Sequence, residues 1–296
     1  MSNKLAGVNL AFVGGDEREL ILLSALAELK ARMQVVGFEK LDQLPDNLNV
    51  ATLEEALPEA QGVILPMTGT DEKGMIRAVY GSRPVVLTKE HLVLLQPGTP
   101  IFVGVAKDYL KDLARSFNLP LIEVAERDDV AILNSIPTAE GAIEIALRET
   151  TITIHGSKCL IFGFGRIGVT LARMLKGLGA EVLVVARKRS DLARAFEQGH
   201  GALDYEEAKS HLSEVNVVFN TVPHLVITRE YLERLGNECI IIDLATAPGG
   251  TDFPVAESFG IKAILAPGLP GKVAPKTAGK ILAHVYPQLL VEQLNL

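Results

Sequence analysis

The chain has 296 residues, which is long enough for two domains with cores of their own. Hydrophobic residues make up 48% of it, and 36 acidic against 29 basic residues leave a formal charge of −7. This balance argues against a nucleic-acid-binding protein, since phosphate binding needs a basic face. No apolar run has membrane-spanning length, and the first residues lack a cleavage site of small residues. We therefore expect a cytoplasmic protein without membrane contact.

Apolar runs alternate with helix-like segments through the first half of the chain. The predicted strands are 8–13, 33–38, 62–65, 85–87 and 101–105, and the helix-like segments include 17–31 and 107–117. Such alternation predicts a parallel sheet covered by helices. We expect residues 1–150 to form a flavodoxin-like N-terminal domain that carries the substrate and the catalytic chemistry.

The second half repeats the alternation. A helical segment at 137–149 leads into predicted strands at 159–162, 182–186, 215–220, 239–244 and 262–265. The fold class is therefore α/β with two domains, the second a Rossmann-type domain over residues 151–276. The apolar helical pattern of the C-terminal segment, 277–296, follows the last of these strands, so we expect this helix to complete the N-terminal domain.

A glycine motif follows the first strand of the second half. Its pattern is Gly163-x-Gly165-x-x-Gly168, placed between an apolar strand and an amphipathic helix. In a dinucleotide site the first glycine permits the tight turn, the second lets the pyrophosphate approach, and the third allows close packing of helix on strand. The pyrophosphate then binds free amides at the helix N-terminus. The predicted cofactor-binding residues of this turn are Gly163, Phe164, Gly165, Arg166, Ile167 and Gly168.

The end of the next strand indicates which dinucleotide binds. An NAD site usually has Asp or Glu there, about 20 residues after the glycines, for the ribose 2′-hydroxyl. This chain has Arg187, Lys188, Arg189 and Ser190 instead. A 2′-phosphate suits this cluster better, so we predict NADP as the cofactor; an ordinary solvated loop is the alternative.

Other candidate residues follow later strands or mark helix starts. Thr221, Val222, Pro223, Asp243 and Ala245 follow strands whose carboxyl ends should meet the cofactor. His224 is the best histidine candidate for proton transfer.

Prolines at 137 and 275 indicate helix starts that could bind the two carboxylates of a dicarboxylate in an interdomain cleft. The residues predicted to do so are Asn134, Ser135, Thr138, Lys276 and Thr277, although they could simply cap helices. Lys276 is also a catalytic candidate, because a lysine opposes the dipole at a helix N-terminus.

The cysteines and histidines predict no metal site. The six histidines show no metal-ligand spacing, and Cys159 and Cys239 both lie in apolar runs. We expect the two cysteines to be buried thiols.

With these segments in view, the chain resembles the A subunit of dipicolinate synthase from spore-forming bacteria. The most specific pieces are NSIPTAEGAI at 134–143, IFGFGRIG at 161–168, VVARKRSDLARA at 184–195, DLATAPGGTDF at 243–253 and APGLPGKVAPKTAG at 266–279. The resemblance implies a dehydrogenase-like subunit that works with a flavoprotein-like B subunit in the mother cell during sporulation. The pair would oxidise a dihydrodipicolinate, from a branch of the lysine pathway, to pyridine-2,6-dicarboxylate. The resemblance assigns no catalytic base.

Two other functions stay open at this point. The ending PGLPGKVAPKTAG is also similar to a segment of methylenetetrahydrofolate dehydrogenases, although the lysine those enzymes carry in the N-terminal domain is not found. Alternatively, the chain could bind NADP(H) as a regulatory or scaffolding subunit without activity of its own.

Overall fold

The computed structural model describes residues 4–296, which divide into two compact units. Unit 1 contains the residues up to Ala131 together with Pro275–Leu296, and unit 2 is Ile132–Ala274. The division falls inside the long helix α5 (Asp128–Glu149), whereas the sequence placed it at 150. The physical reason is that Ala139, Ala142 and Ala146 on α5 belong to the core of unit 2.

Unit 1 contains a six-stranded parallel sheet in the order β3-β2-β1-β4-β7-β8. Its strands are β1 (Asn9–Val13), β2 (Arg32–Val36), β3 (Leu48–Val50), β4 (Gly62–Ile64), β7 (Ile101–Val103) and β8 (Leu121–Glu123). Its helices are α1 (Glu17–Glu28), α2 (Leu53–Ala56), α3 (Lys89–Leu92), α4 (Asp108–Ser116) and α12 (Pro275–Gln293), with a 3₁₀ turn at Val124–Glu126. The predicted parallel α/β domain is confirmed, but the strand order is the six-stranded 3-2-1-4-5-6 type rather than the five-stranded flavodoxin type.

The predicted strand at 85–87 lies outside this sheet. Val85–Val86 form β6, which pairs antiparallel with β5 (Met75–Ile76) in a small hairpin. The segment around the hairpin lies against the end of β1, because Gly15 bridges Ala78 and donates its amide to the Arg77 carbonyl at 2.7 Å. Apolar character alone did not distinguish this hairpin strand from a strand of the central sheet.

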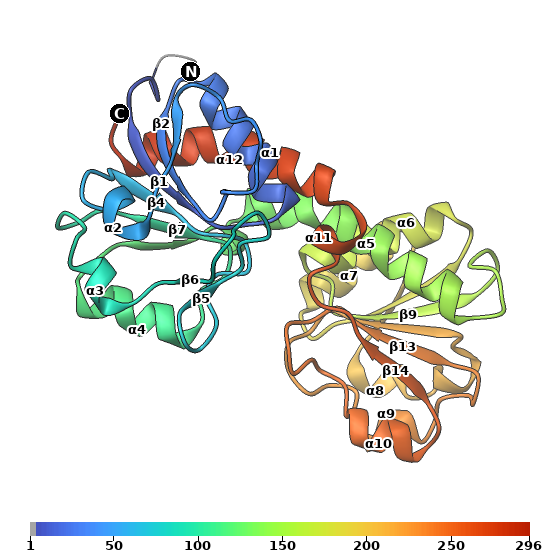
Figure 1. Ribbon diagram of the computed structural model, residues 1–296. Coiled ribbons are helices and arrows are strands. Elements are labelled where there is room, and N and C mark those ends of the chain that lie inside the picture. The colour runs from blue at the N-terminus through green and yellow to red at the C-terminus, as the bar shows by residue number, and fades with distance from the viewer. Residues whose placement is uncertain (1–3) are drawn as a thin grey trace. The chain divides into compact units, whose positions relative to one another are not determined.

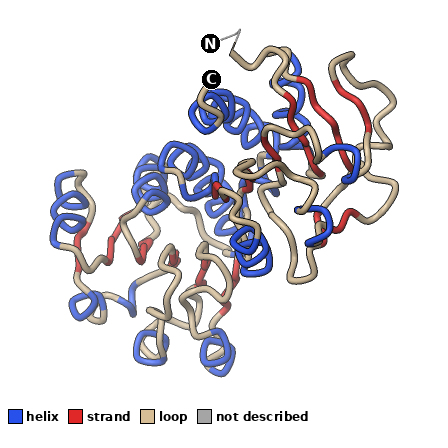
Figure 2. The backbone as a smooth tube through the Cα atoms, turned by 90° about the vertical axis from the view of Figure 1, so that its left-hand side faces the viewer, coloured by secondary structure: helices blue, strands red, loops and turns tan. Residues whose placement is uncertain are grey.

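Helix α12 packs along α1 in unit 1 (Figure 1). A Cβ at Gly279 would lie 2.9 Å from the Arg18 carbonyl oxygen and 2.8 Å from Ile21 Cδ1, so the two helices approach closely near their first turns. At its other end α12 returns toward the beginning of the described chain (Figure 2). There Lys4 Nζ donates to the Leu296 carbonyl at 2.7 Å. The last helix is thus part of the first unit.

Unit 2 repeats the doubly wound order, β11-β10-β9-β12-β13-β14. The strands are β9 (Lys158–Phe162), β10 (Glu181–Val185), β11 (Gly201–Leu203), β12 (Val217–Asn220), β13 (Ile240–Asp243) and β14 (Lys262–Leu265). The helices besides α5 are α6 (Arg166–Gly177), α7 (Arg189–Glu197), α8 (Tyr205–Ala208), α9 (Arg229–Leu232), α10 (Phe253–Ser258) and α11 (Leu269–Val273), with a 3₁₀ turn at Leu212–Glu214. This is the strand order of a Rossmann domain, as predicted.

The two faces of this sheet bury alternate residues of each strand. Cys159 and Ile161 of β9 face the core that contains α5 and α6, whereas Leu160 and Phe162 face the core under α8 to α10. Successive side chains of a strand point to opposite faces, and here both faces are covered. This explains why the strands of unit 2 appear in the sequence as continuous apolar runs.

Helix α5 is long and apolar enough, by length and composition, to cross a membrane. Half of its most apolar stretch is nevertheless buried inside the structure, against β9 and α6 among others. Four acidic residues also lie on its exposed side or in its first turn: Asp128, Asp129, Glu140 and Glu144. These features are those of a core helix.

Both cysteines are free and buried. Burial raises the pKa of Cys159 to about 11 and that of Cys239 to about 12, so neither forms appreciable thiolate near neutral pH. We expect the folded protein at pH 8 to give no rapid reaction with a chromogenic disulfide reagent, and both thiols to react once guanidinium unfolds it. Rapid release of one equivalent from the folded protein would contradict this burial.

Candidate active site

The turn between β9 and α6 has three glycines with different geometric roles. Gly163 has φ of 92°, and a Cβ there would lie 2.4 Å from Thr221 Oγ1. A Cβ at Gly168 would lie 2.2 Å from the Gly163 carbonyl oxygen, so helix and strand touch at this point. A Cβ at exposed Gly165 would meet nothing within 4 Å. The fold itself therefore requires the first and third glycines, whereas the second leaves an open approach to the backbone.

The same turn exposes the N-terminus of α6. Gly165 is the N-cap residue, no side chain caps the helix among the described residues, and no acidic residue lies in the first turn. The first amides of a helix have no partner within it and attract anions. Phe164 contributes only backbone here, because its ring is buried and packs edge-on against His200 at 6.1 Å. This arrangement fits a pyrophosphate.

A basic cluster follows β10. Arg187, Lys188, Arg189 and Ser190 are all exposed, and α7 begins within this segment with Lys188 at its N-cap. Within residues 4–296 none of the three basic side chains forms an ion pair or a hydrogen bond, unlike most exposed arginines of this chain. Three cations at a helix N-terminus repel one another and oppose the helix dipole. Such a cluster is stabilised by an anionic ligand.

Sheet register places Tyr205 beside this cluster. Val185 of β10 pairs with Leu203 of β11, so Arg187 and Tyr205 continue the same register beyond the strand ends. Burial raises the pKa of Tyr205, and the Arg187 guanidinium partly offsets this effect. The tyrosine ring also packs against Phe162 at 5.9 Å between ring centroids. Tyr205 thus forms one wall next to the predicted 2′-phosphate site.

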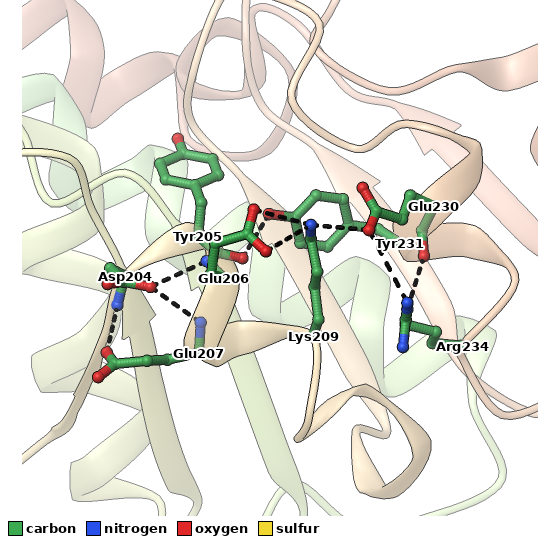
Figure 3. A network of polar contacts seen from close by, with 8 residues as sticks. All are labelled: Asp204, Tyr205, Glu206, Glu207, Lys209, Glu230, Tyr231 and Arg234. Carbon is green, nitrogen blue, oxygen red and sulfur yellow. Dashed lines mark hydrogen bonds and ion pairs between the residues drawn. The ribbon is translucent and has the colours of Figure 1, made fainter.

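A polar network holds Tyr205 in place (Figure 3). Asp204 caps α8 by accepting the amides of Glu206 and Glu207 at 2.9 and 2.8 Å. Tyr231 of α9 donates its hydroxyl to the Tyr205 carbonyl at 2.7 Å. Lys209 joins the two helices through ion pairs with Glu206 and Glu230 at 2.8 and 2.7 Å. Tyr205, beside the basic cluster, is therefore held in place through its backbone carbonyl and through the capped helix to which it belongs.

The carboxyl ends of β12 and β13 are tied together by Asp243. This aspartate is fully buried, and its carboxylate accepts four hydrogen bonds. The donors are Asn220 Nδ2 at 3.0 Å, the Ala245 amide at 3.1 Å, the Gly250 amide at 2.9 Å and Thr251 Oγ1 at 2.7 Å. The prediction of Asp243 as a cofactor ligand is corrected here, because its carboxylate is out of reach and already saturated. Asp243 positions the loops that follow β12 and β13. Ala245, which was also predicted to bind the cofactor, is buried as well.

The segment after β12 is more open. Thr221 donates its hydroxyl to the Phe162 carbonyl at 2.9 Å, and the Val222 amide bonds to Asn220 Oδ1 at 3.0 Å. Pro223 and His224 are exposed at the tip of this loop. Among the described residues, the His224 ring makes no hydrogen bond. Thr221 and Val222 lie next to the glycine turn, since a Cβ at Gly163 would lie 2.4 Å from Thr221 Oγ1 and 3.0 Å from Val222 Cγ2.

The predicted helix start around Pro137 is wrong. Helix α5 begins at Asp128, so Asn134, Ser135 and Thr138 lie in its interior. Fully buried Ser135 contacts the Ile132 carbonyl and Thr170 Oγ1 at 2.6 Å each, and Thr138 donates to the Asn134 carbonyl at 2.8 Å. Proline removes one helical hydrogen bond, but here the buried apolar face maintains the helix through it.

These contacts leave Ser135 and Thr138 without a hydroxyl exposed to a substrate. Asn134 Oδ1 is also buried, and it has no hydrogen-bond partner within residues 4–296. By contrast, the predicted helix start at Pro275 is confirmed, with Lys276 and Thr277 exposed in the first turn of α12. Of the predicted substrate residues, these two have accessible side chains on a helix start.

A charged cluster at the carboxyl edge of the unit 1 sheet was not predicted from the sequence. Asp16, Arg18 and Glu19 follow β1, and a capping box from Asp16 and Glu19 starts α1. Arg18 donates to both oxygens of Asp16, at 3.0 and 2.9 Å. The available signal was the sequence Gly14-Gly15-Asp16 directly after a buried strand, the same position in the unit as the glycine turn in unit 2.

Comparisons with known proteins agree with this geometry. A family model for the N-terminal domain of the dipicolinate synthase A subunit matches residues 9–125. The A subunit of dipicolinate synthase from Bacillus subtilis (strain 168) is 41% identical over 289 residues, which are 97% of each chain. The chain belongs to the family of dipicolinate synthase A subunits.

Two solved structures from the same family share its fold. The A subunit from Bacillus halodurans has a TM-score of 0.93 at 40% identity, covering 97% of this chain and 98% of its own. The A subunit from Bacillus subtilis has a TM-score of 0.94 at 41% identity, covering 98% of both. The methylenetetrahydrofolate dehydrogenases are thus not the family that these comparisons identify.

Unit 2 of this family member contains a dehydrogenase domain. Residues 138–248 match a model described as "D-isomer specific 2-hydroxyacid dehydrogenase, NAD binding domain". The match covers the glycine turn, the basic cluster and the loop after β12. The chain therefore has an oxidoreductase domain for a nicotinamide cofactor, and the residues of the turn fit that group.

Proposed function

We propose that this chain is the NADP-dependent A subunit of a dipicolinate synthase, which oxidises dihydrodipicolinate to pyridine-2,6-dicarboxylate. It would act with a B subunit, as the names of its relatives imply, in the cytoplasm of the mother cell during sporulation. The observation that carries the choice of NADP is the basic cluster after β10, which has no acidic partner among residues 4–296. An NAD site would have a carboxylate there for the 2′-hydroxyl.

Bound NADP⁺ supplies the hydride acceptor, and the residues of the chain bind and orient. The α6 N-terminus and Gly165 would hold the pyrophosphate, and Arg187 with Lys188, Arg189 and Ser190 would hold the 2′-phosphate. Thr221 to Pro223 would line the cofactor beside the glycine turn. Lys276 and Thr277 remain the candidates for substrate contact, and exposed His224 remains the candidate for proton transfer.

The reaction makes modest demands on acid–base chemistry. Aromatisation of the ring favours the loss of hydride and proton, so orientation of the ring against nicotinamide is the main contribution asked of the protein. Such a mechanism does not require a strong general base. This is compatible with the His224 ring, which makes no hydrogen bond among the described residues. Turnover by the isolated chain, compared with turnover after addition of the B subunit, tests whether this chain alone carries the activity or serves as a scaffold.

Replacing Arg187 with alanine should weaken NADPH binding by about 10- to 100-fold, because one charge-assisted contact to phosphate contributes about 1.5–3 kcal/mol. NADH affinity should stay unchanged, since NADH has no 2′-phosphate. Fluorescence titration of both nucleotides measures the two affinities. Arg173→Ala is the matched control, because Arg173 is an exposed arginine on α6 outside the cluster. Equal binding of NADPH and NADH by the wild type would reject the choice of NADP.

A further inference from the structure

The unit 1 sheet reverses its direction of winding between β1 and β4. The chain proceeds outward from β1 through β2 to β3, and from β4 through β7 to β8 on the other side. Loops at the carboxyl ends of the two central strands therefore separate, and ligands of doubly wound sheets bind in the resulting crevice. In this unit the two loops are 14–16 and 65–70. The site already described in unit 2 occupies the corresponding place in its own sheet.

Glu19 holds these two loops in fixed positions. One carboxylate oxygen accepts the Asp16 amide at 2.9 Å, and the other accepts the Met67 amide at 2.8 Å. Glu19 is only 2% exposed, and burial raises its pKa. A Cβ at Gly15 would lie 2.4 Å from Glu19 Cβ, so the glycine is required for this contact. The crevice is thus bounded by backbone that one buried side chain fixes.

Two guanidinium groups converge on the single carboxylate of Asp16. Arg18, with a side chain 11% exposed, bonds to both oxygens, and Arg77 Nη1 lies 3.8 Å from Asp16 Oδ2 with its side chain 59% exposed. An arginine has five N–H donors, of which these bonds use two on Arg18. One carboxylate cannot satisfy two guanidinium groups. Unused N–H donors therefore remain at the mouth of the crevice, above all on exposed Arg77.

The start of α12 adds a third cation. Gly279 packs against the Arg18 carbonyl, and Lys276 lies one turn before it, exposed and without an acidic residue in that turn. Thr70 follows β4 and bridges Ile76, the neighbour of Arg77. Its buried hydroxyl has no partner among the described residues. Besides Asp16, buried Glu19 acts electrostatically on Arg18, but its two oxygens already accept the Asp16 and Met67 amides. Exposed Arg77 and Lys276 and the unsatisfied Thr70 hydroxyl are therefore the groups of this edge with donors left for a ligand.

We propose that Arg18, Arg77 and Lys276 form the subsite that receives a carboxylate of the substrate, with Arg77 as the residue that turns onto it. This inference rests on the proposed function, and it assigns to unit 1 a carboxylate site that the sequence pattern placed partly in α5. The planar guanidinium matches a carboxylate with two parallel hydrogen bonds. Asp16 keeps Arg18 in place through two hydrogen bonds, whereas exposed Arg77 holds only a longer ion pair of 3.8 Å with Asp16 and can turn onto a ligand.

The test is calorimetric binding of pyridine-2,6-dicarboxylate to the full chain saturated with NADPH. Arg77→Gln and Lys276→Gln should each weaken dicarboxylate binding by about 10-fold or more and leave NADPH affinity unchanged. Arg18→Lys, checked by thermal unfolding, should weaken it while the protein stays folded. Arg32→Gln is the matched control, because Arg32 is an exposed arginine at the opposite edge of the same sheet. It should bind the dicarboxylate like the wild type.

Two results would overturn the inference in different ways. If the wild type binds the dicarboxylate and Arg77→Gln binds it equally well, the subsite is elsewhere and the proposed function stands. If the wild type binds NADPH but no dicarboxylate, the inference fails together with the proposed substrate. In turnover with the B subunit present, Arg77→Gln should raise KM more than it lowers kcat, which a general loss of structure would not produce.

Discussion

Replacing Gly168 with alanine should destabilise the protein by about 2–3 kcal/mol or more and abolish NADPH binding. The new Cβ would lie 2.2 Å from the Gly163 carbonyl oxygen, which belongs to the backbone and can move only if the glycine turn itself moves. The turn would then lose the geometry that exposes the α6 amides. Chemical denaturation measures the stability, and fluorescence titration measures the NADPH affinity.

Two alanine controls separate the fold from the site. A Cβ at Gly177, in the last turn of α6, meets nothing within 4 Å, so Gly177→Ala should leave both properties unchanged or stabilise slightly. Gly165 is equally open, so Gly165→Ala should fold normally yet bind NADPH at least about 10-fold more weakly because its methyl group occupies the ligand's approach. Loss of stability in Gly165→Ala, or full NADPH binding by Gly168→Ala, would contradict this division of roles.

Replacing Asp243 with alanine should cost about 4 kcal/mol of unfolding free energy, the second large effect. The change leaves four donors without their acceptor, two of them backbone amides in the segment after β13. The segment after β13 has little room to rearrange, because the backbone is tightly packed at Gly250. A Cβ at this position would lie 2.4 Å from the carbonyl oxygens of Val222 and His224. Chemical denaturation measures the loss.

Asp204→Ala is the comparison for this prediction. Asp204 also accepts backbone amides, but it is an exposed N-cap residue of α8. Its loss should cost only about 1 kcal/mol. If the two substitutions lowered the free energy of unfolding equally, the burial of Asp243 would not add to its stabilising effect. Some other interaction would then have to hold the loops after β12 and β13.

Much of the fold was predictable because both sheets are parallel and covered on both faces. Strands such as β9, β10 and β13 are buried on each side, so they appear in the sequence as unbroken apolar runs between amphipathic helices. The short outer strands β3, β8 and β11 were missed. They have three residues each and contain exposed or half-buried positions, so no apolar run marks them.

Pro137 shows how local signals fail inside a core. A proline followed by hydroxyl residues is typical of a helix start, and the isolated sequence has no stronger signal there. Packing of Ala139, Ala142 and Ala146 against β9 and α6 stabilises the helix after the proline, and the contact of buried Ser135 with Thr170 Oγ1 of α6 holds the turn before it. The acidic first turn at Asp128 and Asp129 was the better signal.

The chemistry of the cofactor turn can be read from the residues alone. Glycine at 163, 165 and 168 and the basic residues after Val185 specify an anion-binding strand–turn–helix, because each role depends on the residue type and on neighbours a few positions away. Three other outcomes required the folded chain: Asp243 is buried and holds two loops, Ser135 is a core residue, and Arg18 and Arg77 converge on Asp16 at the edge of a sheet. Those outcomes depend on contacts between residues far apart in the chain, and local pattern contains no information on such contacts.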